Sequence, residues 1–404
     1  MANDRRIEAL RLEFAKLYGT EPTRWFRAPG RVDLMGSHTD YNDGWVATMT
    51  VDRDTWLAIR PRADRRVRIA TLNLSGSADF SLDAVEADPE VPWADYVRGA
   101  AKVLSDEGVA LAGFDGLLHS TVPFGSGLSS SAAIESVVLL AFAAVSGVEI
   151  EPLQLALLGQ RVENEFVGVA CGILDQYTSV LGTAGHALLL DCRSLTSEAV
   201  EIAPELAVVI CDTRAPRQLT GSEYDERRAQ CEAGAAHIAG YSPDVRALRD
   251  VPEELFEAHE AELDPVVARR CRFIIEENAR VLRLADALPA GDEELLGRLF
   301  DESWDGATRL FEIGAPSMTA MHRAMDGAPG LIARRQAGAG FGGCLVSVVH
   351  RGSVDEFAEH VTREYHGATG IEPSIYGVEA SPGAGELISH DPPGDLSTSR
   401  TAPL

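Results

Sequence analysis

The chain has 404 residues, of which 45% are hydrophobic and 24% charged, a composition typical of a folded globular protein. Its formal net charge of −26 opposes binding to nucleic acid and to anionic membrane surfaces. None of the six cysteines lies in a CxxC pair, which favours reduced thiols in a cytoplasmic protein. The length predicts two domains, and we expect an N-terminal domain over residues 1–195, a C-terminal domain over 196–388 and a disordered tail over 389–404.

The elements follow in chain order from local periodicity. The first 19 residues form an amphipathic pattern without the apolar core of a secretory signal, which predicts a surface helix. The apolar run 136–148 is too short to span a bilayer and predicts a buried helix. Alternating or apolar stretches predict strands at 55–62, 67–72, 116–122, 343–350 and 374–379, and a paired set at 186–192 and 206–213. Helical spacing predicts helices at 130–145 and 152–166, and charged amphipathic helices after residue 215.

A glycine- and serine-rich segment, PFGSGLSSSAA, links the strand expected at 116–122 to the next helix. Free backbone N–H groups at a helix N-terminus, with glycines that allow close approach, form an anion cradle. A serine oxygen there can also bind the Mg²⁺ that accompanies ATP. The segment lacks the lysine of a Walker loop and the third glycine of a dinucleotide-binding loop. An ordinary capped helix start is the structural alternative.

The segment VENEFVGVACGILDQY contains three acidic residues, Glu163, Glu165 and Asp175. A phosphotransferase needs a carboxylate for its metal and often one beside the attacking hydroxyl. The alternative is that the two glutamates are surface charges and that Asp175 caps the next helix.

Two further clusters carry polar groups or glycines. Residues 30–44 read GRVDLMGSHTDYNDG, which is either a solvated loop or a wall that grips a polyhydroxylated ligand. Residues 337–344 read AGAGFGGC, a density of glycine that requires positive φ angles or close backbone approach. A tight entry into a strand and a loop against a ligand both satisfy that requirement.

The four motifs APGRVDLMGSHTDYNDG, VPFGSGLSSSAA, GVACGILDQ and GAGFGGC stand in an order that resembles the galactokinases of the GHMP superfamily. The resemblance implies a two-domain α/β kinase with its active site in the cleft between domains. It implies transfer of phosphate from ATP, with Mg²⁺, to the anomeric hydroxyl of D-galactose, in a monomer or weak homodimer whose partners are the sugar and ATP. A catalytically silent sugar- and ATP-binding regulator and a dinucleotide-dependent oxidoreductase are the alternatives.

The resemblance also implies roles for individual residues. It makes Asp175 the catalytic aspartate that faces the anomeric hydroxyl, and Arg31 its cationic partner. Ser131 and Glu163 are the implied Mg²⁺ ligands. The implied sugar contacts are Ser37, His38, Asp40, Gly172 and Tyr224. The implied nucleotide contacts are Trp93, beside the adenine, and the loop residues Gly125, Ser126, Gly127, Leu128, Ser129, Ser130 and Ser131.

The chain departs from the pattern of the resemblance at two positions. Galactokinases usually read GRVNLIGEHTDYN, whereas this chain has Asp33 for the asparagine and Ser37 for the glutamate. In the family that glutamate helps to hold the C6 hydroxyl of the sugar. Because serine is shorter and neutral, a sugar altered at C6, such as L-arabinose or D-galacturonate, is an alternative to D-galactose. In the conservative interpretation Ser37 or a water molecule completes the bond to galactose.

Overall fold

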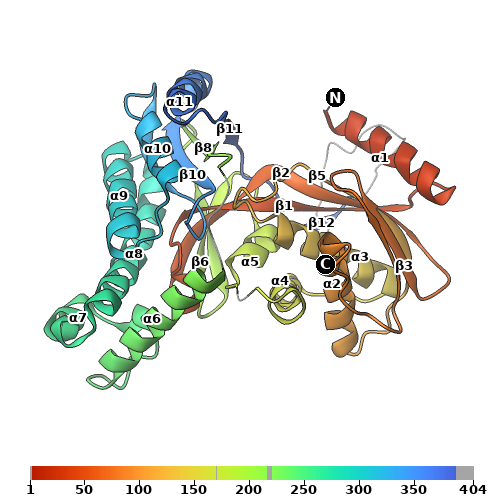
Figure 1. Cartoon of the computed structure of the whole chain (residues 1–404), viewed down its shortest axis with the longest axis horizontal. Coiled ribbons are helices and arrows are strands. Elements are labelled where there is room, and N and C mark those ends of the chain that lie inside the picture. Colours follow the sequence, from red (N-terminus) through yellow and green to blue (C-terminus); the bar gives the residue numbers. More distant parts are fainter. Residues whose placement is uncertain (1, 170, 216–220, 388–404) are drawn as a thin grey trace.

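The computed structural model describes residues 2–169, 171–215 and 221–387. The described residues form two β-sheets with helices packed on them, which confirms the expected α/β fold class (Figure 1). The tail expected over residues 389–404 lies outside the described residues.

The larger sheet has the strand order β12-β1-β2-β5-β3-β4, with β6 beside β2 and β7 beside β6. Its strands are β1 (Arg24–Met35), β2 (Trp45–Pro61), β3 (Arg66–Thr71), β4 (Ser77–Ser81), β5 (Phe114–Ser120), β6 (His186–Asp191), β7 (Thr196–Glu201) and β12 (Gly385–Glu386). β1 and β2 pair antiparallel, so the polar block 36–44 is the connection of a long hairpin. The register of this hairpin shifts between Pro29 and Arg31 and again between Asp33 and Met35. Such irregularities change the direction in which the strand's side chains point, and these two lie just before the polar block.

The smaller sheet has the order β11-β8-β10-β9. Its strands are β8 (Leu206–Asp212), β9 (Leu331–Gln336), β10 (Cys344–His350) and β11 (Ser374–Val378). The expected pairing of 186–192 with 206–213 is wrong, because β6 pairs with β2 and β7 whereas β8 pairs with β10 and β11. The intervening β7 was not predicted, since its sequence TSEAVE is polar and mostly exposed.

The helices in the described residues are α1 (Ala2–Tyr18), α2 (Asp95–Asp106), α3 (Ser130–Ser146), α4 (Pro152–Arg161), α5 (Leu174–Leu181), α6 (Gly221–Ala239), α7 (Glu253–His259), α8 (Pro265–Ala290), α9 (Glu293–Asp305), α10 (Pro316–Ala324) and α11 (Val354–Thr369). The helices expected at 130–145 and 152–166 are confirmed as α3 and as α4 with its continuing π-turn, Val162–Val167. The apolar run of α3 is buried, as expected. In the described part of the chain no helix combines the length and apolar character that a membrane span requires.

The larger sheet is covered on both faces, by α1 on one side and by α2 to α5 on the other (Figure 1). The strand β2 shows how the sequence achieves this, because successive side chains point to opposite faces. Trp56 and Ala58 pack against Leu10 and Phe14 of α1, whereas Leu57 and the residue two positions on, Ile59, join the cluster beneath α3. A third cluster contains residues of β1, β8 and α8, so one apolar core connects the two sheets.

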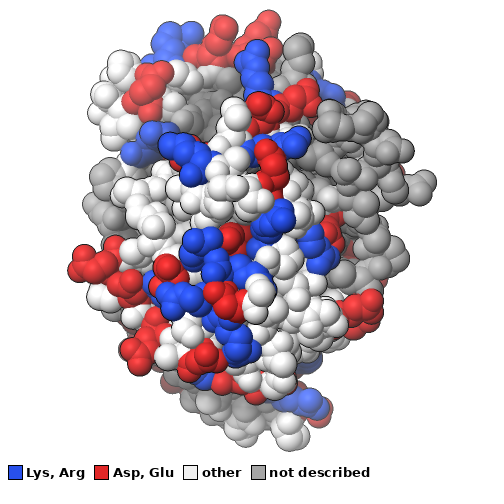
Figure 2. Space-filling view, turned by 90° about the vertical axis from the view of Figure 1, so that its right-hand side faces the viewer, with Lys and Arg blue, Asp and Glu red and all other residues white. Residues whose placement is uncertain are grey.

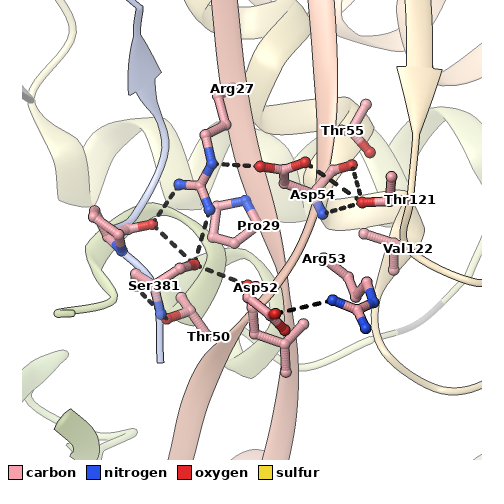
Figure 3. A network of polar contacts seen from close by, with 12 residues as sticks. Arg27, Pro29, Thr50, Asp52, Arg53, Asp54, Thr55, Thr121, Val122 and Ser381 are labelled. Carbon is pink, nitrogen blue, oxygen red and sulfur yellow. Dashed lines mark hydrogen bonds and ion pairs between the residues drawn. The ribbon is translucent and has the colours of Figure 1, made fainter. Parts of the chain in front are cut away.

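The chain end beyond β11 returns to the larger sheet and is held there by a polar network (Figure 3). Arg27 donates from Nε to Asp54 Oδ2 (2.6 Å) and from Nη2 to Ser381 Oγ (2.9 Å). Ser381 also donates to the carbonyl of Val51 (2.8 Å). Ser179 of α5 donates to the carbonyl of Pro29 (2.7 Å), which ties this helix to β1 just before Arg31. The hairpin that carries the polar block therefore has a rigid base.

The surface charges are mixed in spite of the net negative charge. On the side of the molecule where β3 lies, arginines and carboxylates are interspersed (Figure 2). Arg66 of β3 pairs with Asp79 of β4, and Arg62 pairs with Asp64 and Asp115. This side is therefore a network of mutually paired charges.

Candidate active site

A cavity of about 420 Å³ brings the four sequence motifs together. Its lining includes the sugar-motif residues Arg31, Asp33, Ser37, His38 and Asp40, the loop residues Gly125, Gly127, Ser129, Ser130 and Ser131, the acidic-region residues Glu163, Gly172 and Asp175, and Tyr224, Gly338 and Ala339. Three predicted site residues are not part of this lining: Trp93, Ser126 and Leu128.

Arg31 connects three of the motifs. From β1 it donates through Nε (2.8 Å) and Nη2 (2.5 Å) to Oδ1 of Asp175, in the first turn of α5. Its Nη1 donates to the carbonyl of Gly127 in the glycine loop (2.6 Å). Burial alone would lower the pKa of Arg31, but the nearby carboxylates, Asp175 foremost, outweigh it and raise the pKa. Arg31 therefore remains a cation against the carboxylate.

Asp175 does not cap its helix. The N-cap position of α5 is Ile173, and both Asp175 oxygens have other partners. Arg31 occupies Oδ1, and the hydroxyl of Ser129 donates to Oδ2. The Asp175 side chain keeps 25% of its surface exposed, at the cavity. The alternative that Asp175 caps its helix is therefore excluded. Arg31 and Ser129 fix the position of its carboxylate, which faces the cavity.

Asp40 and Gly172 are in direct contact. A Cβ on Gly172 would lie 1.8 Å from Oδ2 of Asp40, so only glycine leaves room for this carboxylate. Burial raises the pKa of Asp40 to about 6, and the charge of Asp175 adds to the rise, against a backbone hydrogen bond from Tyr41 that lowers it. Asp40 therefore changes charge closer to neutral pH than an ordinary aspartate.

His38 has both ring nitrogens engaged by the protein. Its Nε2 lies 2.9 Å from the carbonyl of Ala339, and its Nδ1 lies 2.9 Å from the hydroxyl of Tyr41. Burial lowers the pKa of His38 to about 4, so the ring is neutral at pH 7. The neutral ring then donates from Nε2 to Ala339 and accepts at Nδ1 from Tyr41. His38 lines the cavity, but its polar atoms join the sugar motif to the third glycine cluster.

Aromatic rings flank His38. Its ring centroid lies 5.3 Å from that of Tyr224, which in turn lies 5.4 Å from that of Tyr41. Tyr224 thus reaches the sugar motif from α6, far along the chain. This brings the predicted sugar contacts Ser37, His38, Asp40, Gly172 and Tyr224 to one cavity.

The third glycine cluster approaches the sugar motif closely. The backbone N–H of Gly338 donates to Oδ1 of Asp33 (2.5 Å), and Gly338 has a φ of 76°. Such a φ is readily adopted only by glycine. The cluster is therefore a loop against the cavity as well as the entry to β10.

Sequence reasoning missed Arg335 and Glu277. Arg335 of β9 donates to Ser37 Oγ (3.0 Å) and to Glu277 Oε1 (3.3 Å). Both side chains are fully buried. The only signal in the sequence is the pair of arginines in an otherwise strand-like stretch, ARRQAG, before the glycine cluster.

The glycine loop presents its backbone to the cavity. Gly125 and Gly127 have φ angles of 72° and 90°, and Ser129 adopts a left-handed conformation at the start of α3. The Ser129 hydroxyl donates to Asp175 and does not cap the helix, so this is no ordinary capped start.

Two residues of the loop turn their side chains into the protein. The Ser126 hydroxyl donates to the carbonyl of Pro123 (2.9 Å), and the Leu128 side chain is buried in the core. Those two residues can face a ligand only through their backbone.

Trp93 lies in a short 3₁₀ turn, Pro92–Ala94, before α2. Its ring is partly buried against the core beneath the larger sheet. Its predicted contact with adenine remains a prediction.

Glu163 and Ser131 lie next to each other at the cavity. Glu163 is buried, and its Oε2 accepts from Gln176 Nε2 (2.8 Å), while Ser131 lies within hydrogen-bonding reach. Burial and the charge of Asp175 raise the pKa of Glu163. Oxygen donors of this kind suit Mg²⁺, which is commonly held by one or two protein oxygens together with phosphates. Accordingly, in the described residues no group of three acidic, histidine or cysteine side chains forms a metal cage on its own. Glu165, by contrast, is a surface charge paired with Arg161.

Comparisons with known proteins agree with this geometry. A galactokinase galactose-binding signature matches residues 12–61, and a GHMP kinase N-terminal domain matches residues 95–183. A curated galactokinase from Roseiflexus sp. (strain RS-1) is 43% identical over 384 residues, which cover 95% of this chain and 98% of the relative. The chain belongs to the galactokinase family. It is therefore a sugar kinase of the GHMP superfamily, and the predicted family is confirmed.

Solved structures support the same conclusion. The galactokinase of Lactococcus lactis, solved in complex with galactose, matches with a TM-score of 0.88 and 32% identity over 93% of this chain and 98% of that one. The mevalonate kinase of Methanococcus jannaschii matches with a TM-score of 0.64 and 16% identity over 90% and 99% of the two chains. The second likeness shows the shared GHMP kinase fold alone.

Proposed function

We propose that this galactokinase-family chain transfers the γ-phosphoryl group of ATP, with Mg²⁺, to the anomeric hydroxyl of D-galactose. The products are galactose 1-phosphate and ADP. The main support for the proposal is that Arg31 donates hydrogen bonds both to Asp175 and to the carbonyl of Gly127. It sets a carboxylate and a cation beside the glycine loop, in the cavity that the sugar motif lines.

The sugar lies against the polar block in this proposal. Asp40 accepts hydrogen bonds from ring hydroxyls, and Tyr224, Gly172 and Ser37 complete the surroundings. His38 holds the Ala339 loop in place, because both of its nitrogens already have partners. The galactose in the Lactococcus lactis structure supports a sugar in this cavity.

Asp175 acts on the attacking hydroxyl. It accepts the hydrogen of the anomeric hydroxyl and holds the oxygen in line with the phosphorus as transfer proceeds. Arg31 holds this carboxylate through two N–H···O bonds and offsets charge that develops on the phosphoryl oxygens.

The glycine loop holds the phosphates. The backbone of residues 125–131 supplies N–H donors at the start of α3, and the hydroxyls of Ser130 and Ser131 supply O–H donors. Ser129 takes part through its backbone, because its hydroxyl hydrogen is given to Asp175. Ser131 and Glu163 would hold Mg²⁺, which when bound neutralises charge on the phosphates. Trp93 would flank the adenine.

We propose that this kinase is cytoplasmic and has two domains. We place the N-terminal domain at residues 1–195 and the C-terminal domain at 196–388, with the cavity between them, and we expect a monomer or weak homodimer. The silent-regulator alternative is disfavoured, because Arg31 and Asp175 are both present and bonded to each other.

ADP release with Mg·ATP tests the proposal. D-galactose, L-arabinose, D-galacturonate and N-acetylgalactosamine are compared, with Asp175→Ala as the inactive control. We expect turnover to be strongest with D-galactose and to fall to background in the control. Sugar binding without ADP release from any of the four would favour the silent regulator.

A further inference from the structure

A buried chain of hydrogen bonds ends at the cavity wall. Arg335 Nη2 donates to Glu277 Oε1 (3.3 Å) and to Ser37 Oγ (3.0 Å). Ser37 Oγ lies 2.6 Å from Asp33 Oδ2, and Asp33 Oδ1 accepts from the N–H of Gly338 (2.5 Å). Asp33, Arg335 and Glu277 are fully buried, and Ser37 is only 3% exposed. Of these side chains, Asp33 and Ser37 line the cavity.

The partners of Ser37 fix the direction of its hydrogen bonds. A guanidinium can only donate and a carboxylate can only accept. Ser37 must therefore accept from Arg335 and give its single hydrogen to Asp33. A hydroxyl oxygen has two lone pairs, so one lone pair remains. Towards the cavity, Ser37 is an acceptor and cannot be a donor.

The charged groups behind Ser37 are already paired with one another. Arg335 donates from Nη1 to the carbonyl of Leu34 (2.9 Å) and from Nη2 to Ser37 and Glu277. Glu277 is also bonded by Arg280 (2.8 Å), so the buried cluster balances its carboxylates against its guanidiniums. An anionic group beside Ser37 would meet the carboxylate of Asp33, and Arg31, the arginine in the cavity lining, is already bonded to Asp175 and to the carbonyl of Gly127.

We infer that Ser37, with its hydrogen held by Asp33, selects a sugar whose C6 carries a hydroxyl and rejects one whose C6 is a carboxylate. The inference rests on the proposed function and on position 37 facing C6. A hydroxymethyl group donates to the remaining lone pair of Ser37. The carboxylate of D-galacturonate has no hydrogen to donate and is repelled by Asp33. Asp33 acts through Ser37 and is a positioning residue.

Asp33→Asn should reverse the polarity of this wall at nearly constant side-chain size. The Gly338 N–H requires an acceptor, so the Asn oxygen takes that place and the amide nitrogen faces Ser37. Ser37 then has two donating neighbours, and its own hydrogen turns toward the cavity. The wall becomes a donor and loses its negative charge, which suits a carboxylate.

The experiment compares kcat/KM for D-galactose, D-galacturonate and 6-deoxy-D-galactose in the wild type and in Asp33→Asn. Each sugar is also measured as a competitive inhibitor, which gives its affinity when turnover is slow. The 6-deoxy sugar carries a methyl group at C6 and reports general damage to the site. We expect the preference for galactose over galacturonate to fall by about tenfold or more in the variant, the size of one buried hydrogen bond made or lost.

Ser37→Ala is the second variant, and thermal unfolding checks that both variants fold. Removing the acceptor should lower kcat/KM for galactose toward the value for 6-deoxy-D-galactose and leave the latter nearly unchanged. An equal loss for all three sugars in both variants would overturn the inference in favour of a purely structural network. A wild-type preference for galacturonate would overturn it as well. A wild type that phosphorylates none of the sugars would instead refute the proposed function.

Discussion

Arg31 and Asp175 are separated by 144 residues in the chain, yet two N–H···O bonds of 2.8 and 2.5 Å join their side chains. A third donor of the same guanidinium reaches the carbonyl of Gly127 (2.6 Å). One side chain thus sets the position of the carboxylate and of the glycine loop. Lysine, a point charge on a flexible stem, cannot reproduce this fork.

Arg31→Lys should therefore lower kcat by about 100-fold, the scale of losing one preorganised electrostatic contact, and lower the free energy of unfolding by about 1–3 kcal/mol, because buried hydrogen bonds are lost. Steady-state ADP release and thermal unfolding provide the two readouts. Arg53→Lys is the matched control, because Arg53 lies on β2 in an exposed pair with Asp52 and should retain activity (Figure 3). Equal activity of the two variants would contradict the role of Arg31.

Gly172→Ala should raise KM for the sugar. The added Cβ would lie 1.8 Å from Oδ2 of Asp40 and force that carboxylate out of its place. We expect a rise of about tenfold or more, because a ring hydroxyl loses its acceptor. Gly367→Ala in α11 is the control, since a Cβ there meets nothing within 4 Å. An unchanged KM in Gly172→Ala would show that Asp40 does not bind the sugar.

The pH profile should report Asp40. Its pKa is raised from 3.8 to about 6, so the carboxylate gains a proton as the pH falls through 6 and one of its oxygens then carries a donor hydrogen that a ring hydroxyl cannot replace. The profile of kcat/KM reflects groups of the free enzyme, so we expect its acid limb near pH 6. Asp40→Asn should be less active and should lack that limb. A limb that persists near pH 6 in the variant would assign it to another group.

Much of the site could be predicted because its motifs are local. The glycine loop and α3 follow from residues that are adjacent in sequence, and burial of the apolar run follows from its composition. The role of His38 was harder to foresee. Its partner Ala339 is 301 residues away, so nothing near position 38 shows that its ring nitrogens are occupied.

The network around Ser37 could not be predicted for the same reason. Arg335 lies 298 residues from Ser37, and a buried arginine in a strand has no local signature. Local patterns also failed for β1, because its mixed sequence RWFRAPGRVDLM is buried by contacts with two sheets and shows no clean alternation. Pairing of β8 depended on the distant strands β10 and β11.

His38 should contribute stability that depends on pH. Its pKa falls from 6.5 to about 4 on folding, so between these values the unfolded chain binds more protons. The stabilising contribution is complete above pH 6.5 and is lost as the pH falls toward 4, by up to about 3 kcal/mol. We expect the wild type to lose about 2 kcal/mol more than His38→Asn between pH 7 and pH 5 in denaturant unfolding. Parallel pH profiles would show that His38 is not held neutral.

The most direct test of the central claim is phosphorus NMR of the product formed from D-galactose and Mg·ATP. The account predicts that phosphate appears on the anomeric oxygen only, at a rate that Asp175→Asn lowers by about 100-fold or more, because the amide cannot accept the hydroxyl proton. Phosphate on another oxygen, or an unchanged rate in Asp175→Asn, would contradict the assignment of Arg31 and Asp175 as the groups that act on the anomeric hydroxyl.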